Sequence, residues 1–87
     1  LLPYDVIYVL NRYFQRMAQV INCHHGMINV YMGDGFMALF GIEQPDRAVE
    51  QAIRSGVEML KAVEALNPSL ETLYGQRLRI GIGIHYG

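Results

Sequence analysis

The stretch Met27-Ile28-Asn29-Val30-Tyr31-Met32-Gly33-Asp34-Gly35-Phe36-Met37-Ala38-Leu39-Phe40 decides the fold. Two short apolar runs flank Gly33-Asp34-Gly35, and an Asp-Gly pair between such runs is the strongest short-range signal for a β-hairpin. We therefore predict strands at about 27–33 and 36–41, joined by a two-residue type I′ turn. That turn presents the Asp34 carboxylate at the hairpin tip, where carboxylates and substrate phosphates can together hold Mg²⁺. The alternative is that Asp34 serves the turn alone.

Apolar residues on both sides of the hairpin recur at helical spacing. Steps of three and four predict a helix from Pro3 to about Cys23, with Gly26 just past its end. A second helix is predicted to begin with Asp46 as N-cap and to end at 67–69. Gly56 in its middle costs about 1 kcal/mol relative to alanine, which suggests close packing against a neighbour. The predicted core stripes are Val6, Val9, Leu10, Tyr13, Phe14, Met17, Val20 and Ile21 in the first helix and Ala48, Val49, Ala52, Ile53, Val57, Leu60 and Val63 in the second.

The C-terminal residues alternate as a strand does. Leu78, Ile80, Ile82, Ile84 and Tyr86 would share one face, and Arg79, His85 and three glycines the other. Glycines in a strand often mark the close approach of a ligand or another backbone. The element order α-β-β-α-β predicts an α+β fold with both helices on one face of a small sheet. With one strand ahead of Pro3, it would be a ferredoxin-like βαββαβ sandwich.

The composition is typical of a globular protein and is more apolar than a core of this size requires. Of the 87 residues, 52% are hydrophobic, and a chain of this length forms at most one domain with a modest core. Some apolar surface is therefore expected to meet further segments or a partner. A net charge of −1 without a basic stripe argues against nucleic-acid binding.

Compartment signals are sparse. Cys23 is the single cysteine, which excludes an internal disulfide and fits a reducing compartment. No run reaches the ~18 apolar residues of a membrane span, and no signal peptide is evident, so we expect no membrane contact from this segment. We expect the ordered part of a longer, cytoplasmic polypeptide, in which a membrane anchor elsewhere stays possible.

Four segments, in order, resemble the catalytic domain of class III nucleotide cyclases, the adenylate and guanylate cyclases. They are Leu10–Phe14 for the first helix, Ile28–Gly41 for the hairpin, Asp46–Met59 for the second helix and Arg79–Gly87 for the following strand. The resemblance covers about residues 10–87. It implies that residues 1–87 are part of a single cyclase catalytic domain, whose open sheet face meets a second subunit in a homodimer.

The resemblance also implies a site. Asp34 would be one of two carboxylates holding two Mg²⁺ or Mn²⁺ ions, and Gly33 and Val30 would lie beside the nucleotide. The substrate would be ATP or GTP, converted to the 3′,5′-cyclic nucleotide and pyrophosphate by two-metal catalysis for signal transduction. The second carboxylate is expected on a strand ahead of the first helix, and a catalytic Asn and Arg on a later helix. No catalytic residue beyond the metal ligand is thus expected here, and these 87 residues alone should be inactive.

Val30 departs from the family pattern. Many members carry a lysine three residues before the glycine of the Gly-Asp pair, where it helps to recognise adenine. Valine there leaves three interpretations open: different base selection, relaxed specificity, or a degenerate domain. A dimerisation or regulatory module without turnover is therefore an alternative function, and an unrelated ferredoxin-like domain is a third.

Three other features have simpler interpretations. Cys23-His24-His25 could suggest a metal, but adjacent side chains diverge and no second cysteine completes a zinc spacing. His85 could contact a nucleotide or partner, although an ordinary surface histidine is the simpler interpretation. Tyr4 and Tyr8, four residues apart, could face outward together, although packing at the core or its edge is the simpler role.

Overall fold

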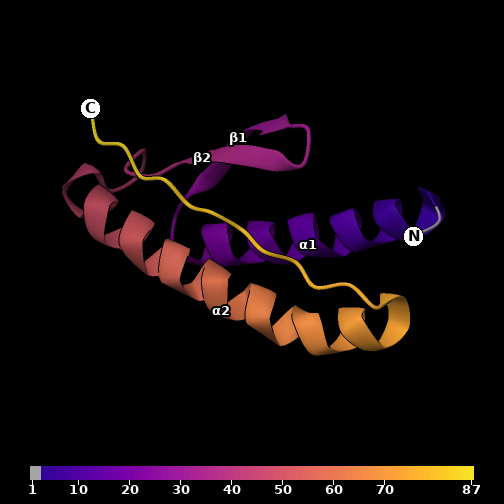
Figure 1. Ribbon diagram of the computed structural model, residues 1–87. Coiled ribbons are helices and arrows are strands. Elements are labelled where there is room, and N and C mark those ends of the chain that lie inside the picture. Colours follow the sequence, from indigo (N-terminus) through magenta and orange to yellow (C-terminus); the bar gives the residue numbers. More distant parts are fainter. Residues whose placement is uncertain (1–2) are drawn as a thin grey trace.

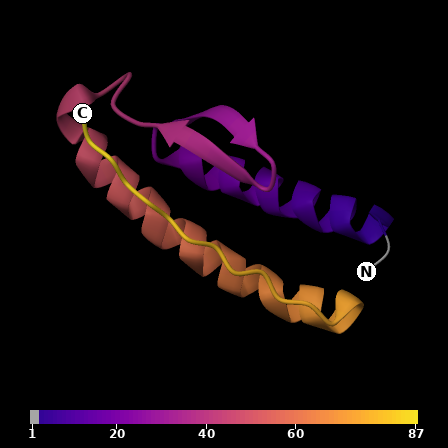
Figure 2. The same ribbon diagram turned by 45° about the horizontal axis from the view of Figure 1, so that its top comes forward.

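The computed structural model describes residues 3–87, an elongated α+β unit of 44 × 21 × 18 Å. Its elements are α1 (Pro3–Cys23), β1 (Met27–Met32), β2 (Gly35–Leu39), the 3₁₀ turn η1 (Pro45–Arg47) and α2 (Ala48–Tyr74). The hairpin lies over α1, and α2 packs beside α1 (Figure 1). The chain after α2 turns back and runs along that helix, as Figure 2 also shows. Among residues 3–87, neither helix combines the length and apolarity of a membrane span.

The core is built on one face of α1, whose predicted bounds are confirmed. Met17, Val20 and Ile21 are fully buried, and Tyr13 nearly so. From α2 they meet Met59, Ala62 and Val63, and from the hairpin and the C-terminal residues they meet Ile28, Phe36, Ala38, Phe40, Leu78 and Ile80. Aromatic rings strengthen the contact between α1 and the hairpin, because Phe14 and Tyr31 meet edge to face with centroids 5.1 Å apart.

The end of α1 is a Schellman motif, in which the left-handed residue is His25 rather than glycine. His25 has φ 64°, and the Gly26 amide donates to the Ile21 carbonyl at 2.9 Å. Gly26 has another reason to lack a side chain. A Cβ at this position would lie 2.4 Å from the Phe40 ring. Gly26, which was expected only to follow the end of the helix, thus leaves the space in which Phe40 packs.

The hairpin exists as predicted, but its turn differs. The strands end at Met32 and begin again at Gly35, so the two central turn residues are Gly33 and Asp34. Only Gly33 has a positive φ, 61°, which is the pattern of a type II′ rather than a type I′ turn. The flexible glycine therefore precedes the aspartate at the tip.

A β-bulge at Asn29 changes which strand residues share a face. The register passes from Ile28 opposite Ala38 directly to Val30 opposite Met37. Opposite residues in an antiparallel pair lie on the same face. Ile28 therefore joins the core, while Val30 lies on the open face with Met37.

The second helix is longer than predicted. Asp46 is not its N-cap but lies in η1, and the helix passes through Pro68 to end at Tyr74. Proline removes one backbone donor there, yet packing of Asn67 and Leu70, both buried, keeps the last two turns in place. Gly75, with φ 66°, supplies the left-handed end, its amide donating to the Glu71 carbonyl at 2.9 Å.

The buried face of α2 is only in part the aliphatic stripe predicted from its sequence, because Val63 of that stripe is buried in the core while most of its other members are not. Ser55, Gln51 and Asn67 are at most 5% exposed. Val49, Ile53, Val57 and Leu60 are instead 47–50% exposed. Small and polar side chains on the buried face let α2 approach its neighbours closely. The apolar periodicity of its sequence therefore arises from two faces of the helix, one in the core and one exposed.

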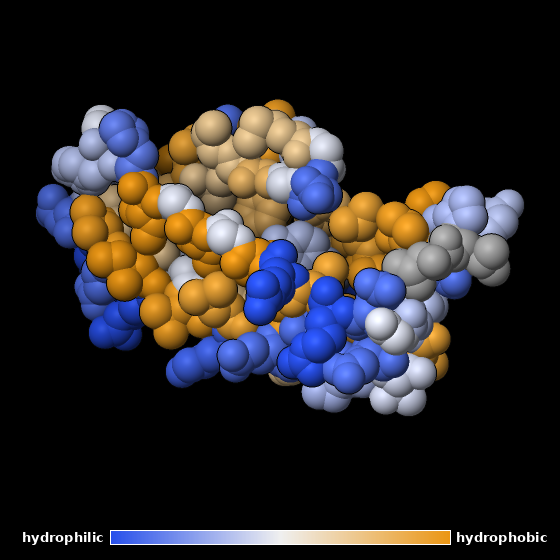
Figure 3. Space-filling model, viewed as in Figure 1, coloured by the Kyte–Doolittle hydropathy of each residue, from blue (hydrophilic) through white to orange (hydrophobic). Residues whose placement is uncertain are grey.

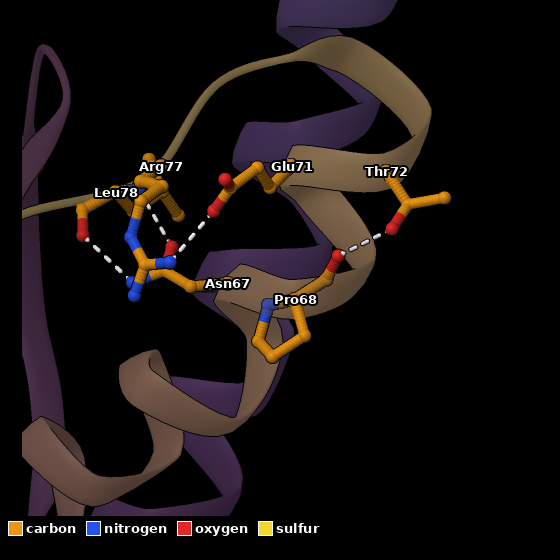
Figure 4. A network of polar contacts seen from close by, with 6 residues as sticks. All are labelled: Asn67, Pro68, Glu71, Thr72, Arg77 and Leu78. Atoms are coloured by element: carbon orange, nitrogen blue, oxygen red, sulfur yellow. Dashed lines mark hydrogen bonds and ion pairs between the residues drawn. The ribbon is translucent and has the colours of Figure 1, made fainter.

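The predicted C-terminal strand is wrong as a sheet strand. Residues 76–87 contain no sheet strand, because among residues 3–87 the only sheet is β1 with β2. The predicted inward face survives only at Leu78 and Ile80, which pack on the core, while Ile82, Ile84 and Tyr86 are exposed. Asn67 fixes the start of this segment by pairing with the Leu78 backbone (Figure 4).

Candidate functional site

The hairpin places Asp34 in solvent at its tip, in the turn between β1 and β2. Gly33 beside it has open space where a side chain would lie. Asp34 and Gly33 are therefore adjacent and accessible, as the sequence analysis expected for a site at this tip. Val30, the third predicted site residue, lies on β1, is 41% exposed and faces away from the core.

The charge at the hairpin tip affects a tyrosine of α1. Burial, and second the negative charge of Asp34, raise the pKa of the Tyr13 hydroxyl. Tyr13 is 7% exposed and contacts Phe36 ring to ring, with centroids 6.5 Å apart. The Asp34 charge thus acts on the phenol of a buried core residue, and no local sequence pattern indicated this relationship.

A metal at this tip would find one suitable ligand in the described residues. The exposed Asp34 carboxylate is the hard oxygen donor that Mg²⁺ and Mn²⁺ favour. Among residues 3–87, however, no three His, Cys, Asp or Glu side chains gather to hold a metal ion. The residues present fit one position of a divalent-ion site, and a complete site requires ligands from elsewhere.

The open face of the hairpin is strongly apolar. Its exposed side chains are 39–54% accessible and come from both strands: Met27, Val30, Met32, Met37 and Leu39. Sequence alternation alone missed this set, because it does not reveal the bulge at Asn29. Val30 consequently belongs to an apolar surface next to Asp34.

The histidines at the end of α1 contact carboxylates instead of one another. His24 hydrogen-bonds to Glu58 of α2, and His25 faces Glu43 with an N–O distance of 3.6 Å. The His24 bond is the largest of the effects that lower the pKa of Glu58.

His85 lies exposed on the C-terminal segment. Tyr8 packs against Tyr74 at the edge of the helix pair, whereas Tyr4 is 84% exposed.

Comparison with known proteins identifies the class to which this hairpin and these helices belong. Residues 2–87 match the family model described as "Adenylate and Guanylate cyclase catalytic domain". The chain therefore belongs to the adenylate and guanylate cyclase catalytic domain family. No solved structure matches it.

Individual relatives agree with the family. The chain is 32% identical over 89 residues to "Adenylate cyclase" of Anabaena cylindrica, covering 98% of this chain and 17% of that protein. It is 29% identical over 86 residues to "Adenylate cyclase 1" of Rhizobium meliloti, covering 98% of this chain and 13% of that protein. An uncharacterised protein of Mycobacterium tuberculosis is 34% identical over 59 residues, 63% of this chain and 11% of its own length. The chain thus spans less than a fifth of each relative.

Proposed function

We propose that the protein containing this chain is a class III nucleotidyl cyclase. It would convert a nucleoside triphosphate, with ATP favoured, to the 3′,5′-cyclic nucleotide and pyrophosphate. The observation that carries the proposal is the exposed Asp34 at the tip of a hairpin in a chain of the cyclase family. Two relatives named adenylate cyclase support ATP over GTP as the substrate.

In this proposal, the chain's own residues bind and position. Asp34 contributes one carboxylate to a pair of Mg²⁺ or Mn²⁺ ions, which when bound stabilise the attacking and leaving oxygens of phosphoryl transfer. Gly33 presents backbone without a side chain, so a phosphate group can approach the turn closely. Val30 offers the nucleotide only apolar contact. The second carboxylate and the catalytic Asn and Arg belong to segments outside these 87 residues.

A homodimer is part of the same proposal. The apolar open face defined above is next to Asp34, and exposed apolar patches mark interaction sites. A second subunit on this face would cover Val30 and bring further ligands toward the tip. We also propose that the complete domain is a ferredoxin-like sandwich and that it works in the cytoplasm.

A second candidate function is a regulatory or dimerisation module that no longer turns over nucleotide. Val30 in place of the family lysine favours it, because valine cannot hydrogen-bond a base. The same apolar face would then serve dimerisation alone.

The test is Asp34→Asn in the complete parent protein, assayed with ATP and with GTP in Mg²⁺ and in Mn²⁺. Asparagine keeps the size and turn compatibility but loses the charge that holds the ions. We expect at least a hundredfold loss of kcat with an unchanged circular dichroism spectrum. Asp46→Asn, an exposed aspartate in η1, is the matched control and should keep full activity.

Three results would each contradict one part of the proposal. An Asp34→Asn protein as active as wild type would make Asp34 a turn residue only. A parent protein without turnover would favour the regulatory module. Cyclic nucleotide made by the isolated 87-residue chain with Mn²⁺ would contradict the division of the site between segments.

A further inference from the structure

A groove of about 500 Å³ lies between β2 and the C-terminal segment, and Tyr13 of α1 lines it. Gly35 and Phe36, the first two residues of β2, line the same groove. Figure 3 shows apolar surface along the C-terminal segment, which forms the opposite wall. Because Gly35 directly follows Asp34, the part of the groove at the start of β2 adjoins the turn at the hairpin tip.

Aromatic packing fixes the ring of Tyr13 in this groove. Its centroid lies 5.3 Å from that of Phe14 and 6.5 Å from that of Phe36, and the residue is only 7% exposed. A side chain held by such packing keeps one orientation, which is what a residue that positions a ligand requires. The fold therefore determines where the Tyr13 hydroxyl lies.

That hydroxyl has no hydrogen-bond partner within residues 3–87. In the same part of the chain, the fully buried side-chain polar atoms without a partner consist of Gln51 Oε1 alone, so the Tyr13 oxygen is not one of them. The small exposed part of Tyr13 consequently includes its hydroxyl oxygen. Tyrosine hydroxyls in nearly buried places usually have a partner, and this one is accessible to a partner that enters the groove.

The hairpin tip is the charged feature nearest in function to this hydroxyl. After burial, the negative charge of Asp34 is the second cause that raises the pKa of Tyr13, although no hydrogen bond joins the two side chains. Two polar groups that are coupled without direct contact are commonly bridged by water. This relationship supports a connection between Tyr13 and whatever Asp34 binds.

We infer that Tyr13 is a positioning residue of the Asp34 site, and that its hydroxyl oxygen accepts a hydrogen bond from a water molecule coordinated to the divalent ion. The inference rests on the proposed function, in which Asp34 binds that ion. Mg²⁺ usually keeps several of its waters in protein sites, and a water bound to a cation is a strong donor. Outer hydrogen bonds of this kind orient the ligands and strengthen metal binding.

A direct contact between Tyr13 and the base of a nucleotide fits the hairpin less well. Tyr13 contacts Phe36, which packs on the core side of the hairpin, whereas Val30 lies on the open face. A base beside Val30 would therefore be separated from Tyr13 by the two strands. The tip is different, because Asp34 lies in the turn beyond the paired residues and is accessible from both sides.

The test measures ion binding by the complete parent protein without nucleotide, using electron paramagnetic resonance of free Mn²⁺. Tyr13→Phe removes only the hydroxyl and keeps the ring contacts, and we expect it to weaken Mn²⁺ binding about tenfold. Tyr8→Phe is the matched control, since it removes the same group from a ring of α1 that packs against Tyr74. Its Mn²⁺ affinity should equal that of the wild type.

A double-mutant cycle separates this inference from the proposed function. Asp34→Asn should remove most of the Mn²⁺ binding, and Tyr13→Phe in that background should cause no further loss, because both changes act on one ion. Undiminished binding by Asp34→Asn would contradict the proposed function and this inference with it. Binding lost in Asp34→Asn but equal in Tyr13→Phe and wild type would overturn the inference alone.

Urea unfolding of the same variants tests a purely structural role for the hydroxyl. We expect Tyr13→Phe to unfold at the same urea concentration as the wild type while binding Mn²⁺ more weakly. A lower unfolding midpoint with unchanged Mn²⁺ affinity would assign the hydroxyl to a hydrogen bond that holds the fold together. That result would also overturn the inference.

Discussion

The Asn67 carboxamide pairs with both backbone groups of Leu78, accepting from its amide at 2.7 Å and donating to its carbonyl at 3.1 Å. A neighbouring β-strand would offer the same donor and acceptor. The side chain is 4% exposed and comes from the turn of α2 just before Pro68. One buried amide therefore determines where the C-terminal segment first rests on the core (Figure 4).

Asn67→Ala should lower the free energy of unfolding by about 1–3 kcal/mol, because it leaves two backbone groups without partners in a half-buried place. Urea unfolding measures the loss, and hydrogen exchange should be fastest at 78–80. Thr72→Val removes an exposed bond to the Pro68 carbonyl on the same helix and should change stability by less than about 0.5 kcal/mol. Equal losses in both variants would contradict the anchoring role.

Two glycine-to-alanine substitutions should change the stability of the fold in opposite directions. At Gly56 an added Cβ meets Ile82 at 3.8 Å, an ordinary contact, so Gly56→Ala should stabilise the helix by up to about 1 kcal/mol. At Gly26 the Cβ would overlap the Phe40 ring, so Gly26→Ala should destabilise by about 1–3 kcal/mol. Thermal unfolding of both variants tests the pair. A stabilised Gly26→Ala protein would contradict the close approach of Phe40.

Acid should weaken the contact between α1 and α2. The hydrogen bond from His24, followed by the charges of His24, Arg16 and Lys61, outweighs desolvation and lowers the pKa of Glu58 below its ordinary 4.5. A lowered folded-state pKa contributes stability that is complete above 4.5 and is lost as the pH falls through the folded value. The free energy of unfolding of the wild type should therefore exceed that of Glu58→Gln at about pH 6, and this difference should disappear as the pH falls to about 3. Glu64→Gln, exposed on the same helix, is the control. A difference in stability between wild type and Glu58→Gln that stays constant with pH would contradict this prediction.

Val30 tests base selection in the complete parent protein. If it makes cyclic nucleotide, its preference for ATP over GTP should be weak, because apolar contact discriminates poorly between purines. Val30→Lys should raise the ratio of kcat/KM for ATP over GTP at least tenfold. Val49→Lys, at a valine on α2 that is 47% exposed against 41% for Val30, should leave that ratio unchanged. A wild type already selective for ATP and insensitive to the lysine would place base recognition on other residues.

The sequence predicted α1 and the hairpin. The bounds of α1 follow from periodicity, and the hairpin follows from its glycines and flanking apolar runs, although its strands end up to two residues away from their predicted limits. Cyclase membership followed from the four motifs and is confirmed by the family match to residues 2–87. The roles of Asp34, Gly33 and Val30 remain predictions, since nothing in the chain's geometry tests them.

The errors share a cause: local patterns do not encode long-range partners. The bulge at Asn29 depends on how two strands pair, and continuation through Pro68 depends on the buried Asn67 and Leu70. The alternation at 78–87 correctly indicates an extended chain. It cannot supply the neighbouring strand that would make those residues part of a sheet.

Three of the five side chains on the open face of the hairpin are methionines, namely Met27, Met32 and Met37, each 46–54% exposed. Thioethers adapt to irregular partner surfaces, but oxidants convert them to polar sulfoxides. Any contact made through this face would then lose its apolar character, while the buried Met17 at the centre of the core would be shielded. Peroxide exposure should therefore impair association through the hairpin before it unfolds the chain, and methionine sulfoxide reductases would reverse the damage.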